Sequence, residues 1–213
     1  MRSVDDEHAI VYIIKKTMLS TATMDWQLGD VQTSPKGIRS AQLTDSTGSP
    51  IIVHLADLQK ALTAPFGSSA FNDPTAQRQN ICFRVDPELE EKIATVDTYM
   101  ADYVKKHAAR LFKGKQMTYK PLLLTKDDYP PLIRCKINVR GTKACRCWTP
   151  TYERCEIPDD LRECRLVPRV QFKSLWVMGS DVGLSVEVLD LMVDQVPEEC
   201  PFVNDNPYLL NKY

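Results

Sequence analysis

One segment carries the clearest fold signal, residues 170–193, which read VQFKSLWVMGSDVGLSVEVLDLMV. Two runs within it, Val170–Met178 and Leu184–Val193, are rich in apolar and β-branched residues, and Ser180–Gly183 between them has the composition of a turn. This pattern predicts a β-hairpin whose connection is Ser180–Gly183. We therefore expect the fold to be built around β-strands.

Other short β-like runs are spread along most of the chain, with Gly141, Pro150, Pro158 and Gly179 marking turns in its second half. Their number and spacing predict a meander or a barrel. The further predicted strands are Ala9–Ile14, Ile51–Leu55, Asn80–Val85, Leu132–Val139, Ala144–Trp148 and Val167–Val177.

A single long helix is predicted for residues 87–112. Asp86 is suited to cap its first turn, Pro87 suits the first helical position, and Gly114 follows its end. Apolar residues recur at steps of three and four, so one side of the helix should face a core. That stripe consists of Leu89, Ile93, Val96, Met100, Val104, Ala108 and Leu111.

Charge is sorted by position along the chain. The formal charge is −5 for residues 1–104, +10 for residues 105–173 and −6 for residues 174–213, although the total is only −1. A basic segment attracts polyanions according to its local charge density rather than the total charge of the chain. Nucleic acid is therefore the first partner to consider.

The basic segment also contains aromatic residues, and bases of an unpaired strand stack on such rings while cations meet its phosphates. Strand alternation should place Arg134 and Lys136 on one face of Leu132–Val139, as the wall of a groove, while Ile133, Cys135 and Ile137 enter the core. The predicted nucleic-acid-binding residues are Lys105, Lys106, Arg110, Lys113, Lys115, Tyr119, Tyr129, Arg134, Lys136, Arg140, Lys143, Arg146, Trp148, Tyr152, Arg154, Arg169 and Lys173.

Two tryptophans of the predicted strands receive different interpretations. Trp148 lies within the basic segment and is the first choice for a stacking residue, with a place in the core as the alternative. Trp176 shares a strand face with Val170, Phe172 and Ser174, and this predicts that Trp176 belongs to the core.

Seven cysteines, an odd number, occur in a chain whose first residues do not have the basic-then-apolar order of a signal peptide, so we expect reduced thiols and an intracellular protein. The longest uncharged apolar run, Ala9–Ile14, is too short to span a bilayer, and no membrane association is expected. No cofactor is expected either. A structural zinc ion is the alternative, and its ligands would be Cys145, Cys147, Cys155 and Cys164.

A catalytic function is not expected. The sequence has no glycine-rich phosphate loop, no nucleophile elbow and no zinc-protease motif, and only three histidines, His8, His54 and His107. A Cys–His nucleophile would have to be assembled in space and has no sequence signature here.

Acidic residues near the C-terminal end suggest a second hypothesis, in which they occupy the basic groove until nucleic acid displaces them. The alternative is an acidic surface that is simply solvated. These residues are Glu187, Asp190, Asp194, Glu198, Glu199 and Asp205.

The order of several motifs between residues 50 and 193 resembles one known family. These motifs are Ala64-Pro-Phe-Gly-Ser-Ser69, Val104-Lys-Lys with Leu111-Phe112, Tyr119-Lys-Pro121, Asp128-Tyr-Pro-Pro-Leu-Ile-Arg-Cys-Lys-Ile137 and Val170-Gln-Phe-Lys-Ser-Leu-Trp-Val-Met-Gly179. The family is that of the OB-fold single-stranded DNA-binding proteins of large nucleocytoplasmic DNA viruses, which are distantly similar to the single-stranded DNA-binding proteins of short-tailed phages.

The resemblance implies a mainly β fold with α, an OB-fold-like antiparallel barrel with the helix inserted, and a non-catalytic, largely sequence-independent role in DNA replication, repair or recombination. It implies backbone contacts by Arg134, Lys136 and Lys173, and stacking by Tyr129 and Trp148. The partner would be single-stranded DNA, in a nucleus or at a viral replication site, with replication or recombination proteins as further partners. The cysteine-rich segment Cys145–Cys164 is a departure from the family.

The predicted organisation is one nucleic-acid-binding domain, residues 1–196, followed by a loose tail, residues 197–213. Homo-oligomerisation is left open by the sequence. The alternative function is a structural or interaction subunit that binds an acidic protein and holds zinc in its cysteine-rich segment.

Overall fold

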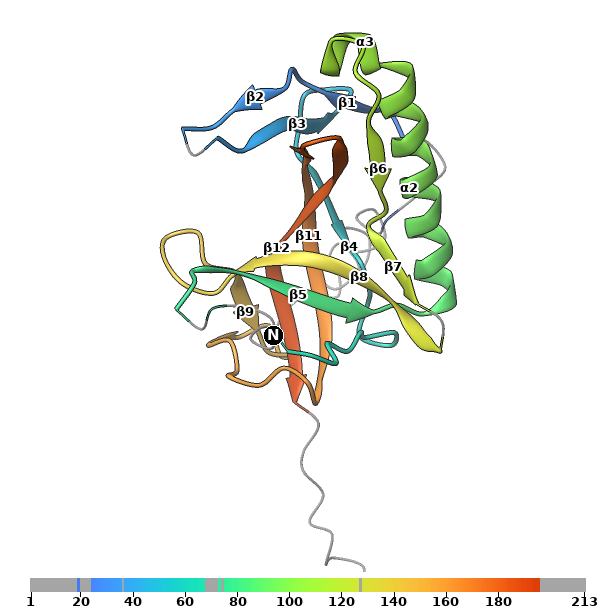
Figure 1. Ribbon diagram of the computed structural model, residues 1–213. Helices are drawn as coiled ribbons and strands as arrows, with labels where there is room; N and C mark the ends of the chain where they lie inside the picture. Colours follow the sequence, from blue (N-terminus) through green and yellow to red (C-terminus); the bar gives the residue numbers. More distant parts are fainter. Residues whose placement is uncertain are drawn as a thin grey trace, which may run out of the picture.

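The computed structural model describes residues 19, 24–35, 37–67, 73, 75–126 and 128–195 (Figure 1). The predicted fold class is confirmed, because the described chain is mainly β, with a strongly curled sheet and one long helix along its side. The elements are β1 (Trp26–Leu28), β2 (Gln32–Thr33), β3 (Arg39–Asp45), β4 (Ile51–His54), β5 (Arg78–Arg84), α2 (Pro87–Lys106), α3 (Ala108–Phe112), β6 (Thr118–Lys120), β7 (Leu123–Lys126), β8 (Tyr129–Asn138), β9 (Arg146–Trp148), β10 (Arg154–Cys155), β11 (Cys164–Met178) and β12 (Asp181–Gln195). The predicted strand Ala9–Ile14 and the predicted tail 197–213 lie outside the described residues.

The long antiparallel hairpin of β11 and β12 is the centre of the sheet. Strand β11 pairs antiparallel with β3 and β4 on one side, whereas β12 pairs parallel with β6, β8 and β9 on the other. The barrel is therefore mixed rather than purely antiparallel. The hairpin itself is confirmed, but its turn is Gly179-Ser180 instead of Ser180–Gly183, because pairing continues to Met178 and Asp181.

Two register shifts interrupt this hairpin, one between Arg169 and Val170 and one between Phe172 and Ser174. Beyond an extra residue in one strand, the odd- and even-numbered positions of that strand exchange faces of the sheet. The buried positions of β11 accordingly change from Val170 and Phe172 to Leu175 and Val177. This change decides the position of Trp176, as described below.

The predicted helix is present in two parts. Asp86 caps α2 by accepting a hydrogen bond from the Leu89 amide at 2.7 Å, and the predicted apolar stripe of α2 is buried. The chain leaves helical geometry at His107 and resumes it in the short α3, so the predicted helical span of about 87–112 is present with an interruption at this one residue. The interruption reorients the last turn, and the adjacent residues Leu111 and Phe112 are both buried there, although neighbouring helical positions point about 100° apart.

A buried carboxylate attaches α2 to the segment that carries β6 and β7. Asp97 accepts hydrogen bonds from the Tyr119 hydroxyl at 2.8 Å and from the Leu122 and Leu123 amides at 2.8 and 3.0 Å. Burial, together with the charge of Asp97, raises the pKa of Tyr119 above its ordinary value. These bonds satisfy amides that would otherwise be unpaired and fix the segment against the helix.

The core lies between the curled sheet and α2. Fully buried side chains such as Phe83, Phe172 and Ile93 come from β5, β11 and α2. Trp26 joins them from β1, with its ring centroid 4.9 Å from that of Phe172. Among the described residues, neither helix combines the length and the apolar character that a membrane-spanning helix needs.

Candidate nucleic-acid interface

Polar side chains from neighbouring strands share the face of the sheet that points away from the core. The predicted alternation in β8 is confirmed, because Ile133, Cys135 and Ile137 are at most 1% exposed while Arg134 is exposed and Lys136 is half-buried. The hydrogen bonds described below join β5, β8, β9, β11 and β12 across this polar face.

Glu187 is at the centre of one group of bonds on the polar face. Its carboxylate accepts hydrogen bonds from Lys173 Nζ at 2.7 Å, from Asn138 Nδ2 at 2.9 Å and from Arg78 at 3.2 Å. The side chain of Glu187 is only 7% exposed, so this charge is stabilised by its three partners rather than by water. The group links β5, β8, β11 and β12, and its carboxylate compensates two cations.

Asp190 organises a second group of bonds, closer to the open end of the hairpin. It accepts hydrogen bonds from Arg146 and Arg169 at 2.8 and 2.7 Å and from Trp148 Nε1 at 3.0 Å. Burial alone would raise the pKa of Asp190, but these three bonds hold that pKa below its ordinary value. The guanidinium of Arg154 lies 4.9 Å from the centroid of the Trp148 ring. One face of this ring is therefore already covered.

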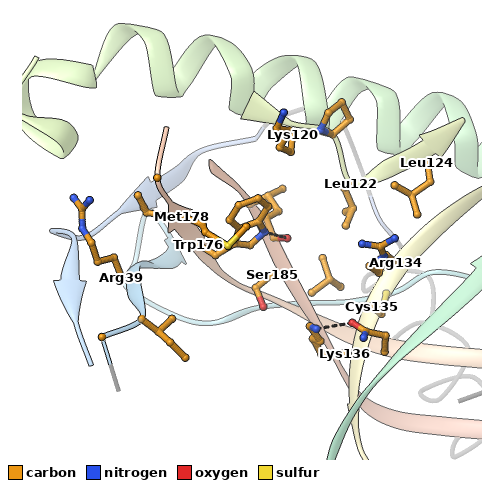
Figure 2. Close-up of a pocket in the computed structure, with 18 residues that line it drawn as sticks. Arg39, Lys120, Leu122, Leu124, Arg134, Cys135, Lys136, Trp176, Met178 and Ser185 are labelled. Atoms are coloured by element: carbon orange, nitrogen blue, oxygen red, sulfur yellow. Dashed lines mark hydrogen bonds between the residues drawn. The ribbon is translucent and has the colours of Figure 1, made fainter. Parts of the chain in front are cut away.

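A cavity of about 760 Å³ opens at the other end of the hairpin (Figure 2). Four cationic side chains line it, Arg39 from β3, Lys120 from β6, and Arg134 and Lys136 from β8. None of the described lining residues is Asp or Glu. We call it the basic cavity, and its other lining residues are Gly37, Ile38, Asn80, Pro121, Leu122, Leu124, Cys135, Trp176, Val177, Met178, Gly179, Leu184, Ser185 and Val186.

The four cations of the basic cavity differ in their partners. Lys120 pairs with Asp181 at 3.3 Å, and Lys136 donates a hydrogen bond to Asn80. Arg39 and Arg134 are exposed and form no ion pair with any described residue. Burial, followed by repulsion from Arg78 and Arg134, lowers the pKa of Lys136. The cavity therefore has an uncompensated positive potential that an anion would relieve.

Trp176 lies in the basic cavity between Arg39 on one side and Arg134 and Lys136 on the other (Figure 2). The prediction that it belongs to the core is wrong, because the register shift at Lys173 reverses the alternation that the prediction assumed. Its indole Nε1 donates a hydrogen bond to the Leu184 carbonyl at 3.2 Å. The ring is half-buried and forms part of the cavity lining.

The position of this ring depends on a glycine. Trp176 pairs with Gly183 across the hairpin, and a Cβ atom added to Gly183 would lie 2.5 Å from the ring, closer than such contacts can be. The ring therefore lies on bare backbone, with its opposite side toward the cavity. The sequence could have identified this residue only with the turn placed at Gly179-Ser180, because the predicted connection Ser180–Gly183 leaves Gly183 in the turn rather than opposite Trp176.

Comparisons with known proteins give a structural similarity but no sequence match. No protein-family model and no curated protein sequence matches the chain. The structure of gp2.5, a single-stranded DNA-binding protein encoded by bacteriophage T7, aligns over 78% of this chain and 98% of its own, with a TM-score of 0.48 and 11% identity.

The single-stranded DNA-binding protein of bacteriophage Enc34 aligns over 83% of this chain and 96% of its own, with a TM-score of 0.43 and 13% identity. Its complex with single-stranded DNA aligns over 79% of this chain and 96% of its own, with a TM-score of 0.42 and 10% identity. At this level of similarity, the function of the chain has to be inferred from its own residues.

The structure distributes the predicted binding residues over several regions. Arg134 and Lys136 are in the basic cavity, and Lys173 contacts Glu187. Arg146, Trp148 and Arg169 bind Asp190, and Arg154 lies over the ring of Trp148. Sequence reasoning missed Arg39, Lys120 and Trp176. Lys120 could have been found from its place in the basic segment, but nothing in the sequence distinguishes Arg39.

The predicted cations near the helix end belong neither to the basic cavity nor to the groups around Glu187 and Asp190. Lys105 and Lys106 end α2, Lys113 and Lys115 follow α3, and all four are exposed. Arg110 donates a hydrogen bond to the Leu28 carbonyl at 2.8 Å and pairs with Asp30 at 3.3 Å. Arg110 therefore also holds α3 against the end of β1. Two further predicted cations, Arg140 and Lys143, are exposed between β8 and β9.

The three predicted tyrosines have different environments. Tyr119 is half-buried and its hydroxyl is bound to Asp97, so it contacts the helix rather than lining the cavity. Tyr129 is 66% exposed, with Lys126 Nζ 5.3 Å from its ring centroid, and Tyr152 is 58% exposed. Neither of the exposed rings lines the basic cavity.

The cysteine-rich segment does not gather four thiols. Cys147 and Cys155 are neighbours, but Cys145 and Cys164 bond to the carbonyls of Arg146 and Asp160. No group of three or more His, Cys, Asp or Glu side chains suited to a metal ion occurs among the described residues. The alternative of a zinc ion on these four cysteines is therefore not supported by their placement.

The acidic residues near the C-terminal end are partly described. Glu187, Asp190 and Asp194 are fixed in β12 and pair with cations of the sheet, the last with Arg165 at 3.5 Å. They neutralise basic residues permanently rather than acting as a detachable segment. The other residues of that hypothesis, Glu198, Glu199 and Asp205, lie outside the described residues.

Proposed function

We propose that this protein binds single-stranded DNA, largely without regard to sequence, in the basic cavity and along the adjoining polar face. The observation that carries the proposal is the lining of the cavity, which combines four cationic side chains and a tryptophan with no carboxylate among its described residues. An unpaired strand offers both chemical groups that such a lining accepts, a row of phosphates and flat apolar bases.

The expected contacts follow from the positions of the side chains. Arg39 is on one side of Trp176, and Arg134 and Lys136 are on the other, so a strand that crosses the cavity would have a base on the indole ring and phosphates near the cations. The ring is already held by its hydrogen bond to the Leu184 carbonyl and by its contact with Gly183. Little ordering of this side chain is then needed on binding.

The lack of sequence preference also follows from the lining. Base identity is read by hydrogen bonds to base edges, whereas stacking and phosphate contacts are shared by all four nucleotides. The apolar part of the lining, which includes Leu122, Leu124 and Val186, offers no side-chain hydrogen bonds. DNA is proposed over RNA because of the family resemblance in the sequence, which also favours a role in replication, repair or recombination.

The test is fluorescence anisotropy of the protein with a labelled oligo-thymidine of about 30 nucleotides and with duplex DNA of equal length, over a series of salt concentrations. We expect the single strand to bind more tightly, with an affinity that falls by about 0.7 log units per log unit of salt for each phosphate contact. An oligo-uridine of equal length compares RNA with DNA. Absence of binding at low salt would refute the proposal and favour an acidic protein segment as the ligand.

A further inference from the structure

Two cysteines face each other across the β9–β10 ladder, and neither of them lines the basic cavity. Cys147 pairs with Cys155 in the antiparallel register, and the thiol of Cys155 donates to Cys147 with a sulfur–sulfur distance of 3.2 Å. Both are free thiols in the structure. Disulfide bonds require Cα atoms about 4.4–6.8 Å apart, and directly paired residues of an antiparallel ladder meet that requirement.

We propose that Cys147 and Cys155 form a redox-active dithiol that is converted to an intramolecular disulfide by small-molecule disulfides. The two sulfur atoms need to approach by only about 1.2 Å to reach a bond length of about 2.05 Å. The short loop that joins the strands, residues 149–153, keeps the thiols together in the folded chain. Of the other cysteines in the same segment, Cys145 and Cys164 bond to backbone carbonyls instead.

The accessibility of the two thiols sets the order of the reaction. Cys155 is half-buried whereas Cys147 is only 1% exposed, so an external disulfide meets Cys155 first. The Cys155 thiolate attacks that disulfide, forms a mixed disulfide and releases one small thiol. Cys147 then loses its proton and attacks the Cys155 sulfur, which releases the second small thiol. Two protein thiols are oxidised and one small disulfide is reduced to two thiols, so electrons and protons balance.

The surroundings of Cys147 affect the second step. Burial, followed by the hydrogen bond with Cys155, raises the pKa of Cys147 to about 12. The second step should therefore be slow at neutral pH and committed once the thiolate forms.

The experiment uses the full-length protein, incubated with oxidised glutathione, alkylated under denaturing conditions and digested with trypsin. Cleavage after Arg146, Arg154 and Arg162 places Cys147 in peptide 147–154 and Cys155 in peptide 155–162. We expect these two peptides to be linked after oxidation, with the loss of two hydrogen atoms, and to be separate after treatment with dithiothreitol. Linkage is read in the unaltered protein, so the result does not depend on the folding of a variant.

Matched variants define the specificity of the link. Cys155→Ser should abolish it, while Cys164→Ser should leave its yield unchanged. The proposal is overturned if Cys155 carries glutathione and Cys147 stays free, if either cysteine links to another one instead, or if both remain alkylated as thiols. DNA affinity is not the readout, because the pair lies outside the basic cavity, so this test and the test of the proposed function can fail independently.

Discussion

The two ends of the β11–β12 hairpin carry similar side chains in opposite electrostatic situations. At the end near Asp190, Arg146 and Arg169 share one carboxylate, and the ring of Trp148 is covered by Arg154. At the turn end, Arg39 and Arg134 have no ion pair with a described residue, and Trp176 lines an open cavity.

The difference teaches that the location of basic residues in a sequence does not decide which of them can bind an anion. A cation whose charge is met by a buried carboxylate already has its partner, and a phosphate would have to compete for it. The basic segment, residues 105–173, thus contributes cations to both ends, but only the turn end has cations without an ion pair among the described residues. The following predictions test this contrast between the ends.

The largest effect is expected from removing the exposed stacking surface. Trp176→Ala should lower the affinity for oligo-thymidine about 5- to 150-fold, because a base stacked on an aromatic ring contributes about 1–3 kcal/mol. Anisotropy at constant salt measures this loss, and Trp176→Phe should restore part of it. Trp148→Ala is the matched control at the other end and should change affinity less than about twofold. A greater loss in Trp148→Ala would place the binding site near Asp190.

An increase in affinity is expected from removing the central carboxylate. Glu187→Gln would release Arg78 and Lys173 from their ion pairs, and two further phosphate contacts, at about fourfold each, should raise the affinity roughly 15-fold and make the salt slope steeper. The same variant should unfold more easily, by about 1–2 kcal/mol in urea titrations, because charged hydrogen bonds are lost. An unchanged affinity would mean that nucleic acid does not reach the centre of the polar face.

A smaller effect is expected from single cations, and it should differ between free and paired ones. Arg134→Ala removes an unpaired cation and should lower affinity roughly fourfold while reducing the salt slope by about 0.7. Arg165→Ala removes a cation that is paired with Asp194 and should leave both quantities nearly unchanged. Equal effects of the two substitutions would contradict the contrast between the ends.

The smallest effect is expected in the pH profile. The pKa of Lys136 is lowered, so this side chain loses its charge at a lower pH than an ordinary lysine, and affinity should decline by about twofold as pH rises through the range just below 10.5. Lys136→Arg keeps the charge at these pH values and should flatten the profile. A profile of the same shape in both proteins would exclude Lys136 as its cause.

Much of the fold was predictable from local patterns. The hairpin, the faces of β8 and most of the helix follow from alternation, periodicity and capping residues that lie within a few positions of one another. The interruption at His107 was not predicted. It accompanies the burial of both Leu111 and Phe112, and that burial depends on the rest of the fold rather than on the local sequence.

The candidate site was predictable only in part, for a physical reason. Arg134 and Lys136 could be assigned from one strand, but the partners of Lys173 and Arg146 are set by the pairing of β12 with distant strands. The local composition of a strand does not predict which distant strand pairs with it. Arg39 reaches the cavity through the pairing of β3 with β11, which is equally distant in the sequence.

The register shift at Lys173 has an evolutionary consequence. Deleting this one residue would remove the bulge and leave plain alternation, in which Phe172, Leu175 and Val177 still face the core. Trp176 would keep its side of the sheet, and the loss would fall on the ion pair between Lys173 and Glu187. The length of β11 can therefore vary at this one position, whereas a deletion at Leu175 would turn Trp176 inward and Val177 outward.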